Sequence, residues 1–112
     1  MLEVKNNGIK LTRGDTARLT VPIENDCTGE PYTVQPDDTL TLSVKRSVSD
    51  KTYVMQKFVK GSNDFHIEPK DTQKIACGRY VYDVELNTAD GDTYTVVDPT
   101  PFELTSEVTR NE

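Results

Sequence analysis

Few residues in this 112-residue sequence have the types and spacing that enzyme or metal chemistry requires. Nucleophilic catalysis needs a nucleophile, a base and an orienting group within hydrogen-bond reach of one another. The single histidine, His66, alternates with Phe65 and Ile67 and is therefore expected on the solvent side of a strand. The sequence has no second His or Cys at metal-ligand spacing and no glycine-rich phosphate loop. We therefore expect a non-enzymatic protein with no cofactor and no bound metal.

Two short motifs have a chemical and a structural interpretation. Asp90-Gly91-Asp92 offers carboxylates at close spacing, but it lacks the further Asp and the distal Glu of a calcium loop. The same residues suit a hairpin turn, which is the favoured interpretation. Arg13-Gly14-Asp15 matches the integrin-binding tripeptide, yet a three-residue match is weak and a tight turn explains it. We expect Gly14 and Asp15 to be structural turn residues.

The charge of the chain is acidic and unevenly distributed. The formal net charge is −6, which argues against direct nucleic-acid binding. Residues 45–60 contain five Lys and Arg and one Asp, a net +4, whereas residues 83–112 contain eight Asp and Glu and one Arg, a net −7. One interpretation is ordinary solvated faces. The other is a homo-oligomer in which a basic face meets an acidic face of a second copy; the interface candidates are Lys45, Arg46, Lys57, Lys60, Asp83 and Glu85.

The sequence predicts neither membrane insertion nor export. It has no run of 18 apolar residues, and its first residues contain no apolar signal core. Without export, Cys27 and Cys77 are expected to be free thiols. The expected topology agrees, because it places them at opposite ends of strands about 26 Å long. A disulfide requires Cα atoms within about 7 Å.

Any binding residues must be positioned by β-strands, of which residues 78–86 are the clearest. Tyr80, Tyr82, Val84 and Leu86 alternate with smaller or charged residues, a period of two that predicts a half-buried central strand. Gly78 marks its start.

The remaining strands are predicted from similar alternation. They cover residues 9–11, 17–23, 39–46, 53–60 and 65–67, the stretch around 94–96, and the stretch from 102 onward. Pro22 places its strand at an edge or a bulge, and the Pro-Thr-Pro run at 99–101 is expected to break the strand there. A short helical turn is predicted near 69–75, and residues 1–7 are expected to be frayed.

The aromatic residues divide into expected core and expected surface. Tyr53 and Phe58 are predicted to point inward beside Met55, and Tyr94 is also predicted to point inward. Tyr32, in the loop before residue 39, is expected to be exposed.

The number and spacing of these strands predict the fold class. About seven to nine short strands, with turn signals every eight to twelve residues, indicate one all-β domain over residues 1–112. An immunoglobulin-like antiparallel sandwich fits best. Asp71, Tyr80 and Tyr82 imitate a tyrosine corner, with Tyr82 standing where such domains place a disulfide cysteine.

Several stretches together resemble a known family. Ile9-Lys10-Leu11-Thr12-Arg13-Gly14-Asp15-Thr16 is followed by an alternating strand, Leu42-Ser43-Val44-Lys45-Arg46 ends a strand in basic residues, and residues 78–86 read Gly-x-Tyr-x-Tyr-Asp-Val-Glu-Leu. An aspartate-rich hairpin and a close on Val108-Thr109 follow. The pattern resembles the immunoglobulin-like N-terminal domain of siphophage baseplate upper proteins and related tail or head-fibre proteins.

That resemblance implies a structural virion protein, assembled in the host cytoplasm, whose partners are other virion proteins. Two other classes stay open: a binding module for host-surface carbohydrate, and a small acidic inhibitor of a host defence that imitates nucleic acid. A carbohydrate module should show a groove with exposed aromatic residues. A nucleic-acid mimic should show Asp and Glu side chains along one ridge.

Overall fold

The computed structural model describes residues 2–5, 8–24 and 29–106, and within them the fold is all-β, as predicted. These residues form eight strands and one short helix in this order: β1 (Leu2–Lys5), β2 (Gly8–Thr12), β3 (Ala17–Thr20), β4 (Thr39–Lys45), β5 (Met55–Lys60), β6 (Asp64–Ile67), α1 (Pro69–Thr72), β7 (Gly78–Asn87) and β8 (Thr93–Thr105). The predicted ending on Val108-Thr109 lies outside the described residues.

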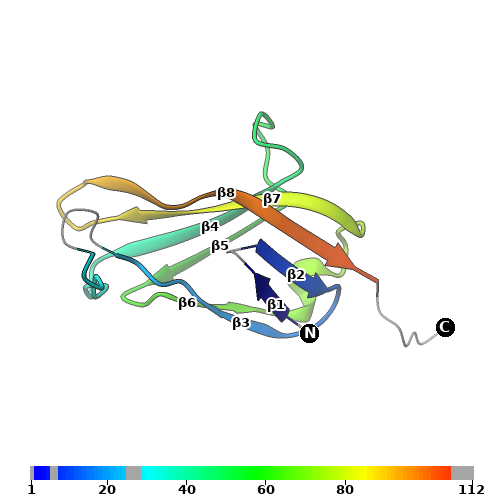
Figure 1. Ribbon diagram of the computed structural model, residues 1–112, viewed down its shortest axis with the longest axis horizontal. Helices are drawn as coiled ribbons and strands as arrows, with labels where there is room; N and C mark the ends of the chain where they lie inside the picture. The colour runs from blue at the N-terminus through cyan, green and yellow to red at the C-terminus, as the bar shows by residue number, and fades with distance from the viewer. Residues whose placement is uncertain (1, 6–7, 25–28, 107–112) are drawn as a thin grey trace.

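The strands form two sheets (Figure 1). The larger sheet has the order β1-β2-β8-β7-β4-β5, and β3 pairs with β6 in a second, two-stranded sheet. All pairs are antiparallel except β2 and β8, which run parallel. The larger sheet is therefore mixed, with one parallel pair in an otherwise antiparallel arrangement. After β2 the chain leaves for the smaller sheet, and the last strand returns beside β2 in the same direction.

β7 occupies the centre of the larger sheet, between β4 and β8. Its residues Tyr80, Tyr82, Val84 and Leu86 are each at most 8% exposed. On β4, Leu40, Leu42 and Val44 lie opposite Leu86, Val84 and Tyr82, so both strands turn the same face inward. Buried side chains of both sheets form one cluster: Ile9, Leu11, Ala17, Leu19, Val21, Ile23, Leu40, Leu42, Val44, Met55, Phe65, Ile67, Tyr80, Tyr82, Val84, Leu86, Phe102 and Leu104.

The two ends of the chain differ from the sequence expectation. Residues 2–5, expected to be frayed, form β1 and pair with β2, because β2 offers a free edge on the side away from β8. The run Pro99-Thr100-Pro101 does not break the last strand; β8 continues through it to Thr105. The ladder with β7 accommodates the irregularity by shifts of register between Tyr82 and Glu85.

Three aromatic residues predicted to be inward are exposed. Phe58 is 65% exposed because the period of two in β5 places it on the opposite face from the buried Met55. Tyr53 precedes β5 and is 50% exposed. Tyr94 is 53% exposed, close to the turn between β7 and β8. Tyr32 is half-buried, so the expectation of an exposed loop residue is only partly met.

Tyr80 connects the start of β7 to the segment that follows the helix. Its hydroxyl donates a 2.5 Å hydrogen bond to the carbonyl oxygen of Ala76, four residues upstream. The neighbouring Tyr82 packs edge-on against Phe102, with ring centroids 6.2 Å apart. Gly78, between Ala76 and Tyr80, has a φ of +155°, which L side chains rarely adopt, so the chain enters β7 through a backbone shape that suits glycine.

Replacing Tyr80 by Phe should destabilise the fold by about 1–3 kcal/mol, because the Ala76 carbonyl oxygen loses its hydrogen-bond partner. Tyr94→Phe is the matched control, since the Tyr94 hydroxyl has only a 3.5 Å contact with Asp92 at the surface. Denaturant titration of both variants measures the difference. A Tyr80→Phe midpoint equal to that of the parent would contradict this role.

Cys77 is exposed and free, whereas Cys27 lies outside the described residues. We expect thiol titration of the unfolded protein, without reductant, to find two reactive groups per chain. In the folded protein Cys77 should react readily because it is exposed. Finding no reactive group in freshly purified protein would overturn the prediction of free thiols.

Candidate functional site

The six interface candidates all belong to one part of the larger sheet. They come from β4, β5, β7 and the connection after β4, and these three strands are neighbours in one sheet. Asp83 and Glu85 lie on β7 directly opposite Ser43 and Thr41 of β4. The Lys45 ammonium stands 5.1 Å from the centre of the Tyr53 ring, a cation–π contact. The basic and acidic segments of the sequence therefore do not correspond to a basic and an acidic surface of the fold.

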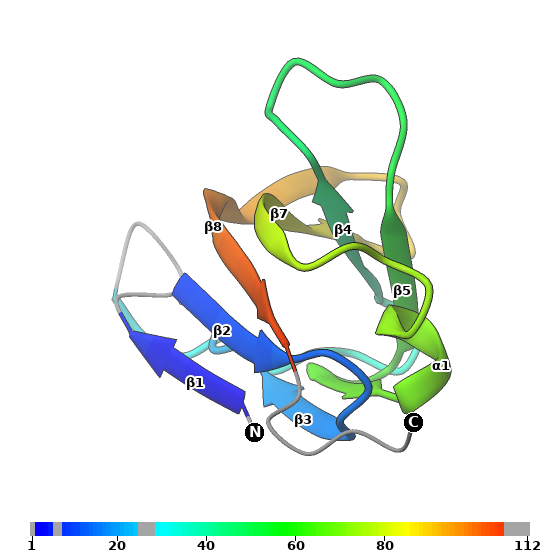
Figure 2. The same ribbon diagram turned by 90° about the vertical axis from the view of Figure 1, so that its right-hand side faces the viewer.

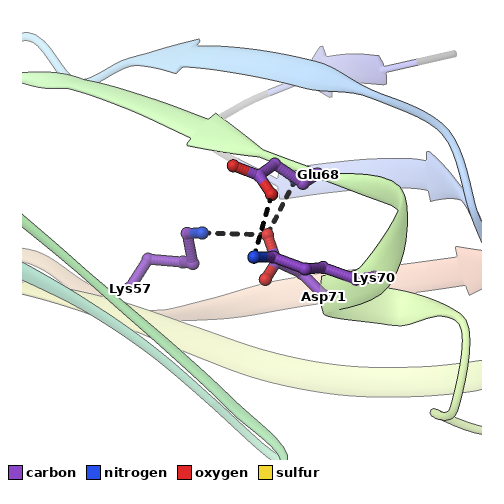
Figure 3. A network of polar contacts seen from close by, with 4 residues as sticks. All are labelled: Lys57, Glu68, Lys70 and Asp71. Carbon is purple, nitrogen blue, oxygen red and sulfur yellow. Dashed lines mark hydrogen bonds and ion pairs between the residues drawn. The ribbon is translucent and has the colours of Figure 1, made fainter.

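Lys57 is engaged within the molecule (Figure 3). Its ammonium lies 2.9 Å from an Asp71 carboxylate oxygen, and the two side chains are 23% and 13% exposed. The same oxygen accepts a 2.7 Å hydrogen bond from the Glu68 backbone N–H, which completes a capping box at the start of α1. Lys57 thus holds the helix against β5 and is poorly placed to meet a partner.

The environment of Asp71 favours its ionised form. Burial alone would raise the pKa of this carboxyl group, but the Glu68 N–H and the Lys57 ammonium outweigh it and lower the pKa below the ordinary value. A carboxylate with a lowered pKa stabilises the folded state above the ordinary aspartate range. That stabilisation is lost as the pH falls through the folded-state pKa.

A second polar cluster, formed by Tyr32, Gln35 and Asp38, lies just before the start of β4, at the opposite end of the sheet from α1. Asp38 is 2% exposed, and its Oδ2 accepts a 2.5 Å bond from the Tyr32 hydroxyl and a 2.9 Å bond from the Gln35 N–H. These bonds, Tyr32 first, lower the pKa of Asp38. The same hydrogen bond raises the pKa of Tyr32 to about 12, since ionising the phenol would set two negative charges together. This cluster is a structural one that sequence reasoning missed.

The turn at residues 13–15 also serves the fold. Gly14 has a φ of +85°, and its N–H donates a 2.8 Å hydrogen bond to the hydroxyl of Thr72, which is 1% exposed. The turn is thereby tied to α1. His66 is exposed on β6 opposite Arg18, on the solvent side of the strand as its alternation indicated.

Exposed cations gather at one end of the larger sheet, which we call the basic end. The turn between β4 and β5 carries Arg46 and Lys51 there, the helical segment carries Lys70 and Lys74, and β7 begins with Arg79. All five side chains are exposed, whereas the nearby Asp50, Glu68 and Glu103 are half-buried. Figure 2 looks onto this end: the β4–β5 connection projects at the top, α1 lies at the lower right, and β7 begins between them.

Exposed carboxylates gather at the other end, which we call the acidic end. Asp90 and Asp92 lie in the β7–β8 turn, at the left in Figure 1, while Asp37 precedes β4 and Asp64 begins β6. These four residues are exposed, and Lys60 is the neighbouring cation, 3.9 Å from Asp37. β4 and β7 are antiparallel, so the β7–β8 turn and the β4–β5 turn must lie at opposite ends of the sheet.

The exposed large apolar side chains do not form a single platform. Val48 and Tyr53 belong to the β4–β5 connection at the basic end, whereas Tyr94 lies beside the β7–β8 turn at the acidic end. Phe58 lies between them, on the outer face of the edge strand β5. Each charged end therefore carries at least one exposed aromatic ring.

No cluster of three or more His, Cys, Asp or Glu residues suited to a metal ion occurs in residues 2–5, 8–24 and 29–106. Among the same residues, no helix is long and apolar enough to cross a membrane.

Comparisons with known proteins give no assignment: no protein-family model matches the chain, and no curated protein matches it.

Replacing Lys57 by Met should destabilise the protein by about 1–3 kcal/mol, because Asp71 loses a charged hydrogen-bond partner in a mostly buried position. The pKa of Asp71 should rise, so acid unfolding should begin at higher pH. Lys60→Met is the matched control, since its 3.9 Å contact with Asp37 joins two largely exposed side chains. That variant should stay within about 0.5 kcal/mol of the parent. Equal losses in the two variants, measured by denaturant and acid titration, would refute the structural role of Lys57.

Proposed function

We propose that this chain is a non-enzymatic structural component of a phage virion, in a tail, a baseplate or a head fibre, and acts through protein–protein contacts. The observation that carries the proposal is the separation of exposed charge between the two ends of one sheet. Cations gather at one end and carboxylates at the other, and each end carries an exposed aromatic ring. Aromatic and Arg side chains are the residues in which contact surfaces are enriched.

The fold interpretation behind the proposal is an immunoglobulin-like sandwich. Three features support it: β4, β7 and β8 lie side by side as the central strands of one sheet, β3 and β6 pair in another, and both supply the same core. The Tyr80 hydroxyl bonded to the backbone upstream of β7 suits a tyrosine corner. The sequence resemblance to baseplate and fibre domains points in the same direction.

A second candidate function is favoured by one feature of β7. Asp83 and Glu85 project from the same face of the strand, about 6.6 Å apart along it, and Asp90 and Asp92 follow in the turn. Such a row of carboxylates suits a small acidic inhibitor that imitates a phosphate backbone. A carbohydrate-binding module gains less support, because the exposed aromatic rings lie on separate parts of the sheet.

Quantitative mass spectrometry of gradient-purified phage particles tests the proposal. Particles should come from a culture that carries the gene, with a deletion strain as the control. A virion component should cofractionate with intact particles in many copies, and its deletion should leave particles defective or incomplete. A chain found only in the unassembled fraction, with particles of normal composition, would contradict the virion role and favour the inhibitor.

A further inference from the structure

The partner of the two charged ends can be argued from their complementarity. Arg46 and Lys51 project from the β4–β5 connection, and neither has an ion pair among the described residues. Asp90 and Asp92, in the β7–β8 turn, likewise have no ion pair in the part of the chain that the structure describes. Each end therefore offers the charge that the other lacks.

The apolar residues add short-range contact to this attraction. Val48 is 63% exposed and Tyr53 50% exposed beside the cations, and Tyr94 is 53% exposed beside the carboxylates. Exposed charge pairs steer association more than they stabilise it, so a lasting contact needs apolar area. Tyr53 is held in place by Lys45, which reduces the entropy lost when it binds.

We propose that the basic end of one copy binds the acidic end of a second copy, head to tail. The β4–β5 connection, with Arg46, Lys51 and Tyr53, meets the β7–β8 turn, with Asp90 and Asp92, of the next copy. Because the two surfaces are different and lie at opposite ends of the sheet, the contact is heterologous. It repeats to give a ring if the rotation closes and a filament if it does not. This inference rests on the proposed function, which it deepens by naming a second copy as the partner.

Paired charge reversals test the contact. One variant carries Arg46→Glu and Lys51→Glu, and the other carries Asp90→Lys and Asp92→Lys. Each alone presents like charges at both ends and should lose association by about tenfold or more. Mixed in equal amounts, the two variants again present opposite charges at every contact, so association should recover.

Sedimentation velocity over a range of protein concentrations, at low and high salt, provides the readout. Lys10→Glu with Arg18→Glu is the matched control for the variant at Arg46 and Lys51, because it makes the same change of net charge at exposed sites on β2 and β3, away from both turns. It should associate like the parent. Association of the parent should weaken as salt rises, since exposed charges are screened within about 8 Å at physiological ionic strength.

Three outcomes would overturn the head-to-tail contact: a parent that stays monomeric at low salt, reversals that leave association unchanged, or a mixture that does not recover. Recovery on mixing also shows that both variants are folded. The particle experiment decides the virion role separately. A monomeric chain present in particles would refute the self-contact alone, whereas an associating chain absent from particles would refute the virion role alone.

Discussion

The alternation of β7 is the constraint on which the rest of the structure depends. Its four inward residues, Tyr80, Tyr82, Val84 and Leu86, contact the core from the centre of the larger sheet, and burial of Val84 and Leu86 contributes about 1.5–3 kcal/mol each. A slip of one residue against β4 or β8 would turn that entire set toward water. The register of β7 therefore fixes the position of both neighbours. It also fixes which ends of the sheet carry the β4–β5 and β7–β8 turns.

Polar contacts then attach the smaller elements to this sheet. A four-residue helix such as α1 cannot persist through its own hydrogen bonds. It is held by the capping box at Glu68 and Asp71, by Lys57 from β5, and by the Thr72 hydroxyl that binds the Gly14 N–H. One helical turn thus joins β5 and the β2–β3 connection, which are far apart in sequence. Lys57 carries charge, yet its contacts make it part of the scaffold.

The sequence was informative where one physical effect dominated. Strong alternation predicted the 78–86 strand and its neighbour at 39–46, and Pro69 and the residues before Gly78 predicted the short helix. The predictions failed at Phe58, which was placed inward although alternation with Met55 puts it on the outer face of β5, and at residues 99–101, where the prolines were expected to end the strand. There a strand paired with β7 tolerates two prolines by an irregular register.

The charged ends could be predicted only in part, because they are a product of topology. Counting charge along the chain assigned Lys57 and Lys60 to a basic surface, but Lys57 pairs with Asp71, and Lys60 lies at the acidic end beside Asp37. Conversely, Lys70, Lys74 and Arg79 lie outside the basic segment of the sequence and inside the basic end of the fold. In an antiparallel sheet, the connections after successive strands lie alternately at one end and at the other. The end at which a charged connection lies therefore depends on its place in the order of the strands. When the cations lie in connections at one end and the carboxylates lie in connections at the other, the two ends of the sheet carry opposite charge. A repeating head-to-tail contact requires such a difference between its two surfaces.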